Sequence, residues 1–300
     1  MLIALMDVLL PVLIVALVGV VLARRFTIDV DTLGKISLHG LTPALAFRST
    51  MTSQISPDVG LRLVGGYLLV TAVGAALSWL VTRGWSVPTR RSVTACTVIG
   101  NNGNFGLPIA LLALGTEGLD AAVVIFVTSL VVMFTIGPML LGSSGGIRGG
   151  LLVVARLPVT WALVVAGMLR VAGVEVAGGL MSGIDLLADA AIPLVLLQLG
   201  VQIGGSGRIH RTGPVLATVA LRAVLIPALG CLAGVLVGLD GLGLASLLLA
   251  CVMPVAVNTF MLAREYGADS DTVASAVVLS TFCSIPILLV LIPWLPRIVG

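Results

Sequence analysis

The chain has 300 residues, of which 59% are hydrophobic and only 10% are charged, and its mean hydropathy is +1.21. This composition excludes an ordinary soluble domain and indicates one integral membrane domain. The formal net charge of +3 does not indicate a nucleic-acid-binding protein, because the arginines are scattered singly between apolar runs.

The first apolar run, residues 1–23, is long enough to cross a bilayer and ends at Arg24 and Arg25. It lacks the basic start of a cleaved signal peptide, so we interpret it as the first span. Nine further apolar runs follow, which predicts an all-α integral membrane fold with ten transmembrane helices. The nine runs cover residues 33–53, 60–82, 92–114, 119–141, 151–172, 180–203, 213–238, 241–263 and 272–295.

The chain divides into two halves of five spans each. The Gly/Ser-rich stretch at residues 142–150 predicts a short cytoplasmic linker between a first repeat, residues 1–141, and a second, residues 151–300. Prolines in the two halves match at offsets of 146 to 150 residues, which indicates an internal repeat; the alternative is coincidence among 14 prolines. The matched pairs are Pro11 with Pro158, Pro43 with Pro193, Pro108 with Pro254, and Pro138 with Pro286. With five spans in each copy, the second repeat is inverted relative to the first.

Lysine and arginine gather in the loops that follow odd-numbered spans, which hold eleven of the 16 such residues. The even-numbered loops hold little basic charge besides Arg62 and Arg170. By the positive-inside rule the odd-numbered loops are cytoplasmic, and both termini are extracytoplasmic in a multi-pass protein of the cell membrane.

The most informative stretch runs from Asn101 to Pro108, inside the fourth span. Its asparagines, glycines and proline cannot continue a lipid-facing helix, and irregular backbone at membrane depth is stable only inside protein or beside a polar cavity. A second interruption, residues 253–259, lies in the ninth span. Broken helices four and nine of inverted repeats are expected to cross near the membrane centre, which is typical of the binding site of a secondary transporter.

At each break the following half-helix presents free N–H groups and a positive dipole end, which attract a carboxylate without a buried cation. Asparagine amides add donors and acceptors. The expected ligand is therefore a small organic anion; the alternative is that the amides only satisfy the freed backbone groups. The candidate substrate-binding residues are Asn101, Asn102, Asn104, Pro108, Pro254, Asn258 and Thr259.

Ionisable residues inside spans are the candidates for coupling to a proton or cation. His39 and Asp189 each lie four residues before a matched proline, and Asp185 lies one turn before Asp189. The alternative for both aspartates is hydration at the outer end of the seventh span. Arg222 lies about ten residues into the eighth span, too deep to snorkel. We expect it inside the protein, either as a structural ion-pair partner or as an anion contact.

No catalytic or metal site and no cofactor is expected. The chain lacks GxSxG, HExxH and Walker A motifs, and its four cysteines fall within apolar spans without metal-ligand spacing. An enzyme is therefore not expected. The alternative to a carrier is an anion channel or a transporter-like membrane receptor, since broken helices also build selectivity filters.

The chain resembles the auxin efflux carrier family, which includes the PIN-type auxin carriers and bacterial malate or malonate permeases. The resemblance rests on Pro254 followed by Ala263-Arg264-Glu265-Tyr266, on Pro286 in the next span, and on Asn101 with Gly106-Leu107-Pro108. It covers the whole chain and is most specific in the fourth and ninth spans.

This resemblance implies a homodimer in the lipid bilayer and a transport domain that moves elevator-fashion, with its site at the crossing of the two broken helices. The implied substrates are dicarboxylates such as malate or malonate, or an auxin-like carboxylate. Asn258 and Thr259 stand where the auxin carriers have Val-Pro, which favours a smaller and more polar anion than auxin.

Overall fold

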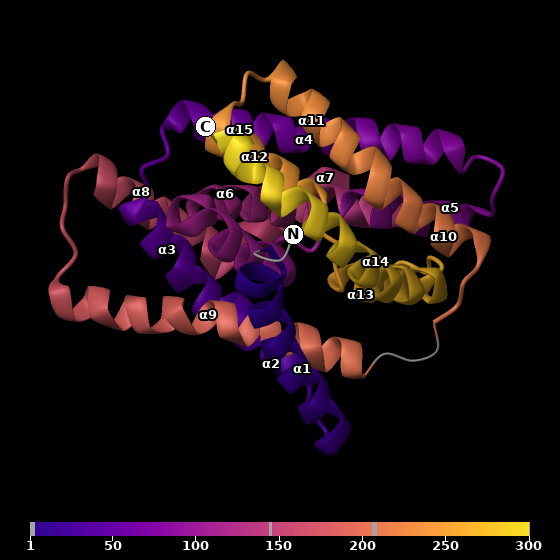
Figure 1. Ribbon diagram of the computed structural model, residues 1–300, viewed down its shortest axis with the longest axis horizontal. Coiled ribbons are helices and arrows are strands. Elements are labelled where there is room, and N and C mark those ends of the chain that lie inside the picture. Colours follow the sequence, from indigo (N-terminus) through magenta and orange to yellow (C-terminus); the bar gives the residue numbers. More distant parts are fainter. Residues whose placement is uncertain (1–3, 144–145, 206–208, 300) are drawn as a thin grey trace.

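The computed structural model describes residues 4–143, 146–205 and 209–299. In this part of the chain every named element is a helix (Figure 1), as the sequence predicts. The first half contains η1 (Ala4–Leu9), α1 (Leu10–Arg25), α2 (Val30–Ile36), η2 (Ser37–Leu41), α3 (Thr42–Thr52), α4 (Pro57–Val81), α5 (Val87–Val98), η3 (Asn102–Gly106) and α6 (Leu107–Leu141).

The named elements of the second half are helices as well. It contains α7 (Gly146–Arg156), α8 (Pro158–Val171), α9 (Gly178–Gly204), α10 (Gly213–Ala220), η4 (Leu221–Leu225), α11 (Ile226–Leu236), α12 (Gly241–Cys251), α13 (Asn258–Glu265), α14 (Ser270–Leu291), η5 (Ile292–Trp294) and α15 (Leu295–Val299). Figure 1 shows α6 in the middle of the molecule, with α4 and α11 on one side and α9 on the other.

Six of the described helices are long and apolar enough to cross a membrane, or up to seven if the bent pair α7–α8 forms one span. The ten predicted spans therefore stay a prediction. The difference arises where predicted spans are broken or polar. Residues 33–53 fall on α2, η2 and α3, which carry Lys35, His39 and Arg48, and residues 92–114 and 241–263 contain the two interruptions.

Four short π-helical segments, η1 to η4, each end two residues before a proline: Pro11, Pro43, Pro108 and Pro227. Proline lacks an N–H group, and its ring clashes with the carbonyl four residues earlier in an α-helix. A π-helical turn widens the backbone just before the ring, so these segments absorb the clash without ending the helix. They also rotate the side chains that they carry, among them His39, Asn104 and Arg222.

The predicted boundary between spans four and five, residues 115–118, is a kink inside α6. Gly115 has φ of +72° and ψ of −164°, a conformation outside the helical region that glycine tolerates because it has no Cβ. The predicted linker at 142–150 is shorter than expected, because α7 begins at Gly146; its residues 144 and 145 lie outside the described part of the chain.

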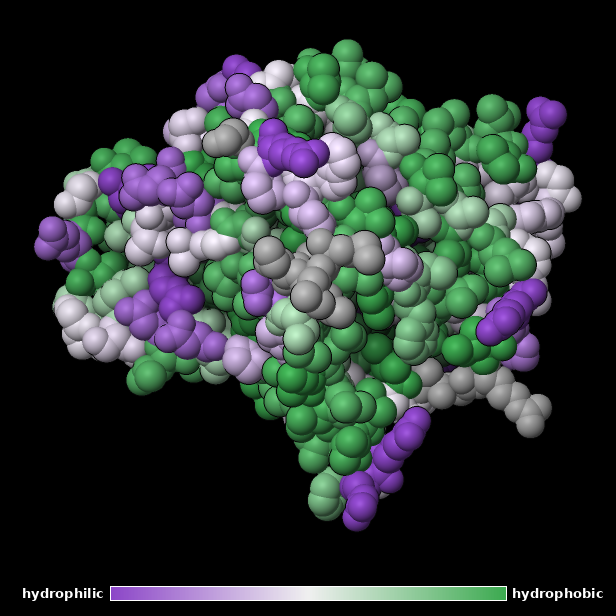
Figure 2. All heavy atoms as spheres, viewed as in Figure 1, coloured by the Kyte–Doolittle hydropathy of each residue, from purple (hydrophilic) through white to green (hydrophobic). Residues whose placement is uncertain are grey.

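Large apolar side chains are exposed along the outer helices, for example Leu17 of α1, Val171 of α8 and Leu186 of α9. Figure 2 shows hydrophobic residues over much of the visible face, with groups of hydrophilic residues at its upper centre, in its left part and at its edges. A soluble protein does not expose apolar patches of this extent. The surface is that of a protein solvated by lipid.

Candidate functional site

The two interruptions foreseen in the sequence are present, and they pair with each other. After α5 ends at Val98, the backbone N–H of Asn101 donates to the carbonyl of Pro254 (2.7 Å), and the N–H of Ala256 donates to the carbonyl of Ile99 (3.0 Å). Gly100 and Val255 thus form an isolated antiparallel bridge. Each break satisfies backbone groups of the other that would otherwise be buried without partners.

The matched prolines do not occupy equivalent places in this crossing. Pro108 lies in the first turn of α6, whereas Pro254 lies in the paired extended segment. The bridge joins residues 155 positions apart, Gly100 and Val255, and not the 146 positions that separate the prolines. The inverted repeat stays a prediction, and the bridged residues are not a pair that the proline offset matches to each other.

Arg222 is the charged side chain at the crossing. It is 3% exposed; its Nε donates to the carbonyl of Met253 (2.8 Å) and its Nη1 to the carbonyl of Thr97 (2.9 Å). Its Nη2 is buried without a hydrogen-bond partner. A Cβ on Gly100 would lie 1.9 Å from this Nη2, so only glycine fits there. Of the two roles that the sequence left open for Arg222, an ion pair is not observed: the ion pairs among the described residues join Arg48 to Asp189 and Arg62 to Asp58.

In the first break, the side chains of Asn101 and Asn102 are directed into the protein interior. Asn101 accepts a hydrogen bond on Oδ1 from the backbone N–H of Asn104 (3.1 Å), and Asn102 donates from Nδ2 to the hydroxyl of Tyr67 (2.9 Å). Asn101 and Asn102 are 6% and 3% exposed. Asn101 therefore caps the following segment, which is the alternative that the sequence leaves open. Its Nδ2, Oδ1 of Asn102 and the hydroxyl of the fully buried Thr259 have no hydrogen-bond partner.

A cavity of about 650 Å³ lies beside the crossing. Asn104 from the first break and Asn258 from the second both line it, and so do His39 and Lys35. The other candidates, namely Asn101, Asn102, Pro108, Pro254, Thr259, Asp185, Asp189 and Arg222, do not line it. Apolar residues make up much of the wall, including Leu107, Phe126, Leu130, Leu199, Phe260, Met261 and Val277.

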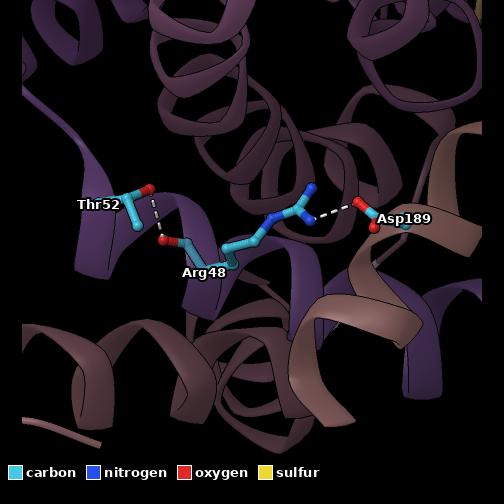
Figure 3. A network of polar contacts seen from close by, with 3 residues as sticks. All are labelled: Arg48, Thr52 and Asp189. Atoms are coloured by element: carbon cyan, nitrogen blue, oxygen red, sulfur yellow. Dashed lines mark hydrogen bonds and ion pairs between the residues drawn. The ribbon is translucent and has the colours of Figure 1, made fainter. Parts of the chain in front are cut away.

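Asp189 has a different position from the one expected of a coupling residue. Its carboxylate on α9 pairs with Arg48 of α3 at 2.5 Å, and its side chain is 70% exposed (Figure 3). Thr52 bonds the carbonyl of Arg48 in the same view (3.0 Å). Asp185 is half-exposed. Neither aspartate lines the cavity, whereas His39 does.

The structure adds two polar residues that the sequence did not single out. Gln198 of α9 lines the cavity and is 5% exposed. The sequence signal that could have indicated it is a polar amide within an apolar span, five residues after Pro193. Asp120 lies in α6 and accepts a hydrogen bond from Ser49 of α3 at 2.5 Å. No group of histidine, cysteine, aspartate and glutamate suited to a metal ion occurs among the described residues.

Outside the spans, Asp269 fixes the start of α14 against the start of α5. Partial burial raises the pKa of this carboxyl, but hydrogen bonds from the backbone and hydroxyl of Thr272 and from the hydroxyl of Thr89 outweigh it, so the pKa lies below its ordinary value. The contact ties the helix that precedes the first break to α14, which forms one wall of the cavity.

A second cavity, of about 440 Å³, is lined by charged residues that include Asp58, Arg62, Glu117 and Asp240. It shares no lining residue with the first. Arg62 donates to the carbonyl of Gly238 (2.6 Å) and pairs with Asp58 (2.9 Å). Its positive charge is therefore balanced by partners in the wall of this cavity.

Comparison with known proteins agrees with this architecture. The model of the family described as "Membrane transport protein" matches residues 151–292. An "Uncharacterized transporter" of Methanothermobacter thermautotrophicus is 25% identical over 93% of this chain and 94% of its own. A "Putative malonate transporter" of Rhizobium meliloti is 26% identical over 83% and 81% of the two chains. A "Probable auxin efflux carrier component 1b" of Oryza sativa is 29% identical over 39% of this chain and 22% of its own.

These relatives are named as transporters and not as enzymes, and the similarity to the first two covers most of the chain. The chain is thus similar to a family of membrane transport proteins over its second half, and to proteins named as transporters over most of its length.

Proposed function

We propose that this transporter is a carrier that moves small organic anions across the cell membrane by alternating access. The observation that supports the proposal is the cavity beside the crossing, which is lined by one asparagine from each break. Amide N–H groups bind carboxylate oxygens directly, and charge-assisted bonds of this kind are stronger than neutral ones.

The backbone beside the cavity also favours a negatively charged ligand. Asn104 lies in η3, which leads into α6, and Asn258 is the first residue of α13, so both helical segments begin beside the cavity. Helix N-termini carry a partial positive charge that favours anions. Lys35 adds positive potential at the cavity, and Asp31 offsets a part of it.

The size of the cavity admits both classes of carboxylate that the names of the relatives mention, malonate and auxin. A volume of about 650 Å³ with a mainly apolar wall suits a carboxylate with an apolar body as well as a small dicarboxylate. The substrate test therefore includes malonate, malate and an indole carboxylate.

Elevator-type movement within a homodimer, with both termini outside the cell, is part of the proposal. The first cavity is lined by residues near 30–39 and 201–209, from segments that the basic loops place inside. The second is lined by residues 54–62, Glu117 and 238–243, from segments placed outside. Two separate cavities beside α6 fit a carrier that opens to one side at a time.

The test is uptake of the three labelled carboxylates into liposomes that contain the purified protein. We expect saturable uptake of at least one of them. Asn258→Ala and Asn104→Ala each remove a hydrogen bond worth roughly 1.5–3 kcal/mol, and so should weaken affinity about ten- to hundredfold. Asn101→Ala is the matched control: because Asn101 caps a segment and does not line the cavity, it should lower thermal stability and leave affinity near that of the wild type.

Unchanged affinity in both cavity variants, with folded protein, would reject the site. Flux that neither saturates nor accumulates beyond the electrochemical gradient would favour the anion channel instead.

A further inference from the structure

Arg222 lies in a helical segment whose geometry is altered by a following proline. Pro227 lies in the first turn of α11, and the π-helical segment η4 just before it contains Arg222. The continuous helical stretch Gly213–Leu236 is apolar enough to cross a membrane, and Arg222 lies within it, buried. A charged side chain at this depth is costly and needs an identifiable partner.

Its partners are the ends of two helices. Thr97, whose carbonyl accepts from Nη1, lies in the last turn of α5; Met253, whose carbonyl accepts from Nε, lies two residues beyond the end of α12. The last carbonyls of a helix have no intrahelical donors and carry a partial negative charge. Two such ends converge at the crossing, and the guanidinium lies between them.

The charge of Arg222 is balanced by these backbone dipoles and not by a carboxylate. The titratable side chains close to it are Tyr67 of α4, Cys96 of α5 and Cys251 of α12, which are neutral at physiological pH. None of the ion pairs among the described residues includes it. The guanidinium also fills the space, since its Nη2 occupies the place of a side chain at Gly100.

We propose that Arg222 is a resident cation at the crossing, in the place where an exchangeable cation would otherwise bind. Carbonyl oxygens that converge at the ends of broken helices are the type of ligand that sodium takes in membrane carriers. With the guanidinium bound to them, the crossing needs no sodium ion, and it should lose this independence when the guanidinium is removed. The proposal concerns the crossing and holds for any substrate of the first cavity.

The test compares wild type with Arg222→Gln and Arg222→Lys in detergent, by thermal unfolding in sodium, potassium or choline chloride at equal ionic strength. Arg83→Gln, at an exposed arginine, controls for the loss of one positive charge. The wild type, Arg83→Gln and Arg222→Lys should unfold at the same temperature in all three salts. Arg222→Gln should unfold at a lower temperature in choline, and sodium should raise that temperature saturably by several degrees, because a ligand stabilises according to its concentration over Kd.

A saturable sodium shift in the wild type would overturn the proposal, since an exchangeable cation would then bind beside Arg222. A folded Arg222→Gln protein that is equally destabilised in all three salts would overturn it too. If the variant fails to fold in choline, its recovery as folded protein in sodium supports the proposal, and failure in both salts counts against it.

Discussion

Replacing Gly100 by alanine tests whether the crossing is held together by the guanidinium. The new Cβ would lie 1.9 Å from Nη2 of Arg222 and 2.9 Å from its Cζ, whereas ordinary contact begins at 3.4 Å. The guanidinium would have to move by more than an ångström, and its bonds to Thr97 and Met253, at 2.9 and 2.8 Å, do not survive such a shift.

The expected cost follows from those bonds. Losing one hydrogen bond to a charged group costs roughly 1.5–3 kcal/mol, and overpacking a dense interior costs about 1–3 kcal/mol. At about 2–4 °C per kcal/mol for a chain of this size, loss of one bond alone lowers the apparent Tm by roughly 3–12 °C. Gly65→Ala is the control, because a Cβ there has no neighbour within 4 Å, and alanine favours the helix.

The assay is thermal unfolding of the purified variants, combined with a double-mutant cycle. If Gly100→Ala acts through Arg222, it should cost less in the Arg222→Gln background than in the wild type, because the two changes disrupt the same contacts. A Tm no lower than that of Gly65→Ala, or effects that add without coupling, would refute this account of the crossing.

Three further changes probe contacts in which Arg222 takes no part. Tyr67→Phe leaves the buried Nδ2 of Asn102 without its acceptor and should cost about 1–3 kcal/mol in thermal unfolding; an unchanged Tm would show that another acceptor replaces the hydroxyl. Asp189→Asn should change stability by less than about 1 kcal/mol, because its ion pair with Arg48 is exposed, and a larger loss would mean that the pair contributes to the packing of α3 on α9 despite this exposure. The pKa of Asp269 is lowered, so its stabilising contribution is complete above the ordinary carboxyl pKa of about 3.9 and is lost as pH falls through the lower folded value. Asp269→Asn should therefore be less stable than wild type at neutral pH and approach it in acid, and an equal deficit at every pH would contradict the assignment.

The two breaks could be predicted from the sequence, because asparagine, glycine and proline inside apolar runs interrupt a helix at membrane depth. A crossing of the two breaks was also expected, from the inverted repeat, but the backbone pairing between them was not part of that expectation. The register did not follow. It depends on which residues leave the helix first, and the chain leaves α5 after Val98, well before Pro108.

Which asparagines reach the cavity was likewise beyond the sequence. Asn101, Asn102 and Asn104 are close neighbours, yet the π-helical turn before Pro108 directs the first two into the protein and the third into the cavity. The partners of Arg222 were hidden for a related reason: they are backbone carbonyls, which carry no residue identity. An ion pair is the partner that a sequence suggests, because only side chains are visible in it.

The crossing separates the two kinds of helix end. The C-terminal ends of α5 and α12 meet at Arg222, inside the protein, and the segments that carry Asn104 and Asn258 begin beside the cavity. Because the negative ends are already neutralised by a residue of the chain, the positive ends are the part of the crossing left to act on a ligand. A preference for anions then requires no arginine in the cavity itself. Mutations should therefore affect the two sides of the crossing differently. Changes at Arg222 and Gly100 should alter its stability, and changes at Asn258 and Asn104 should alter the affinity for the substrate.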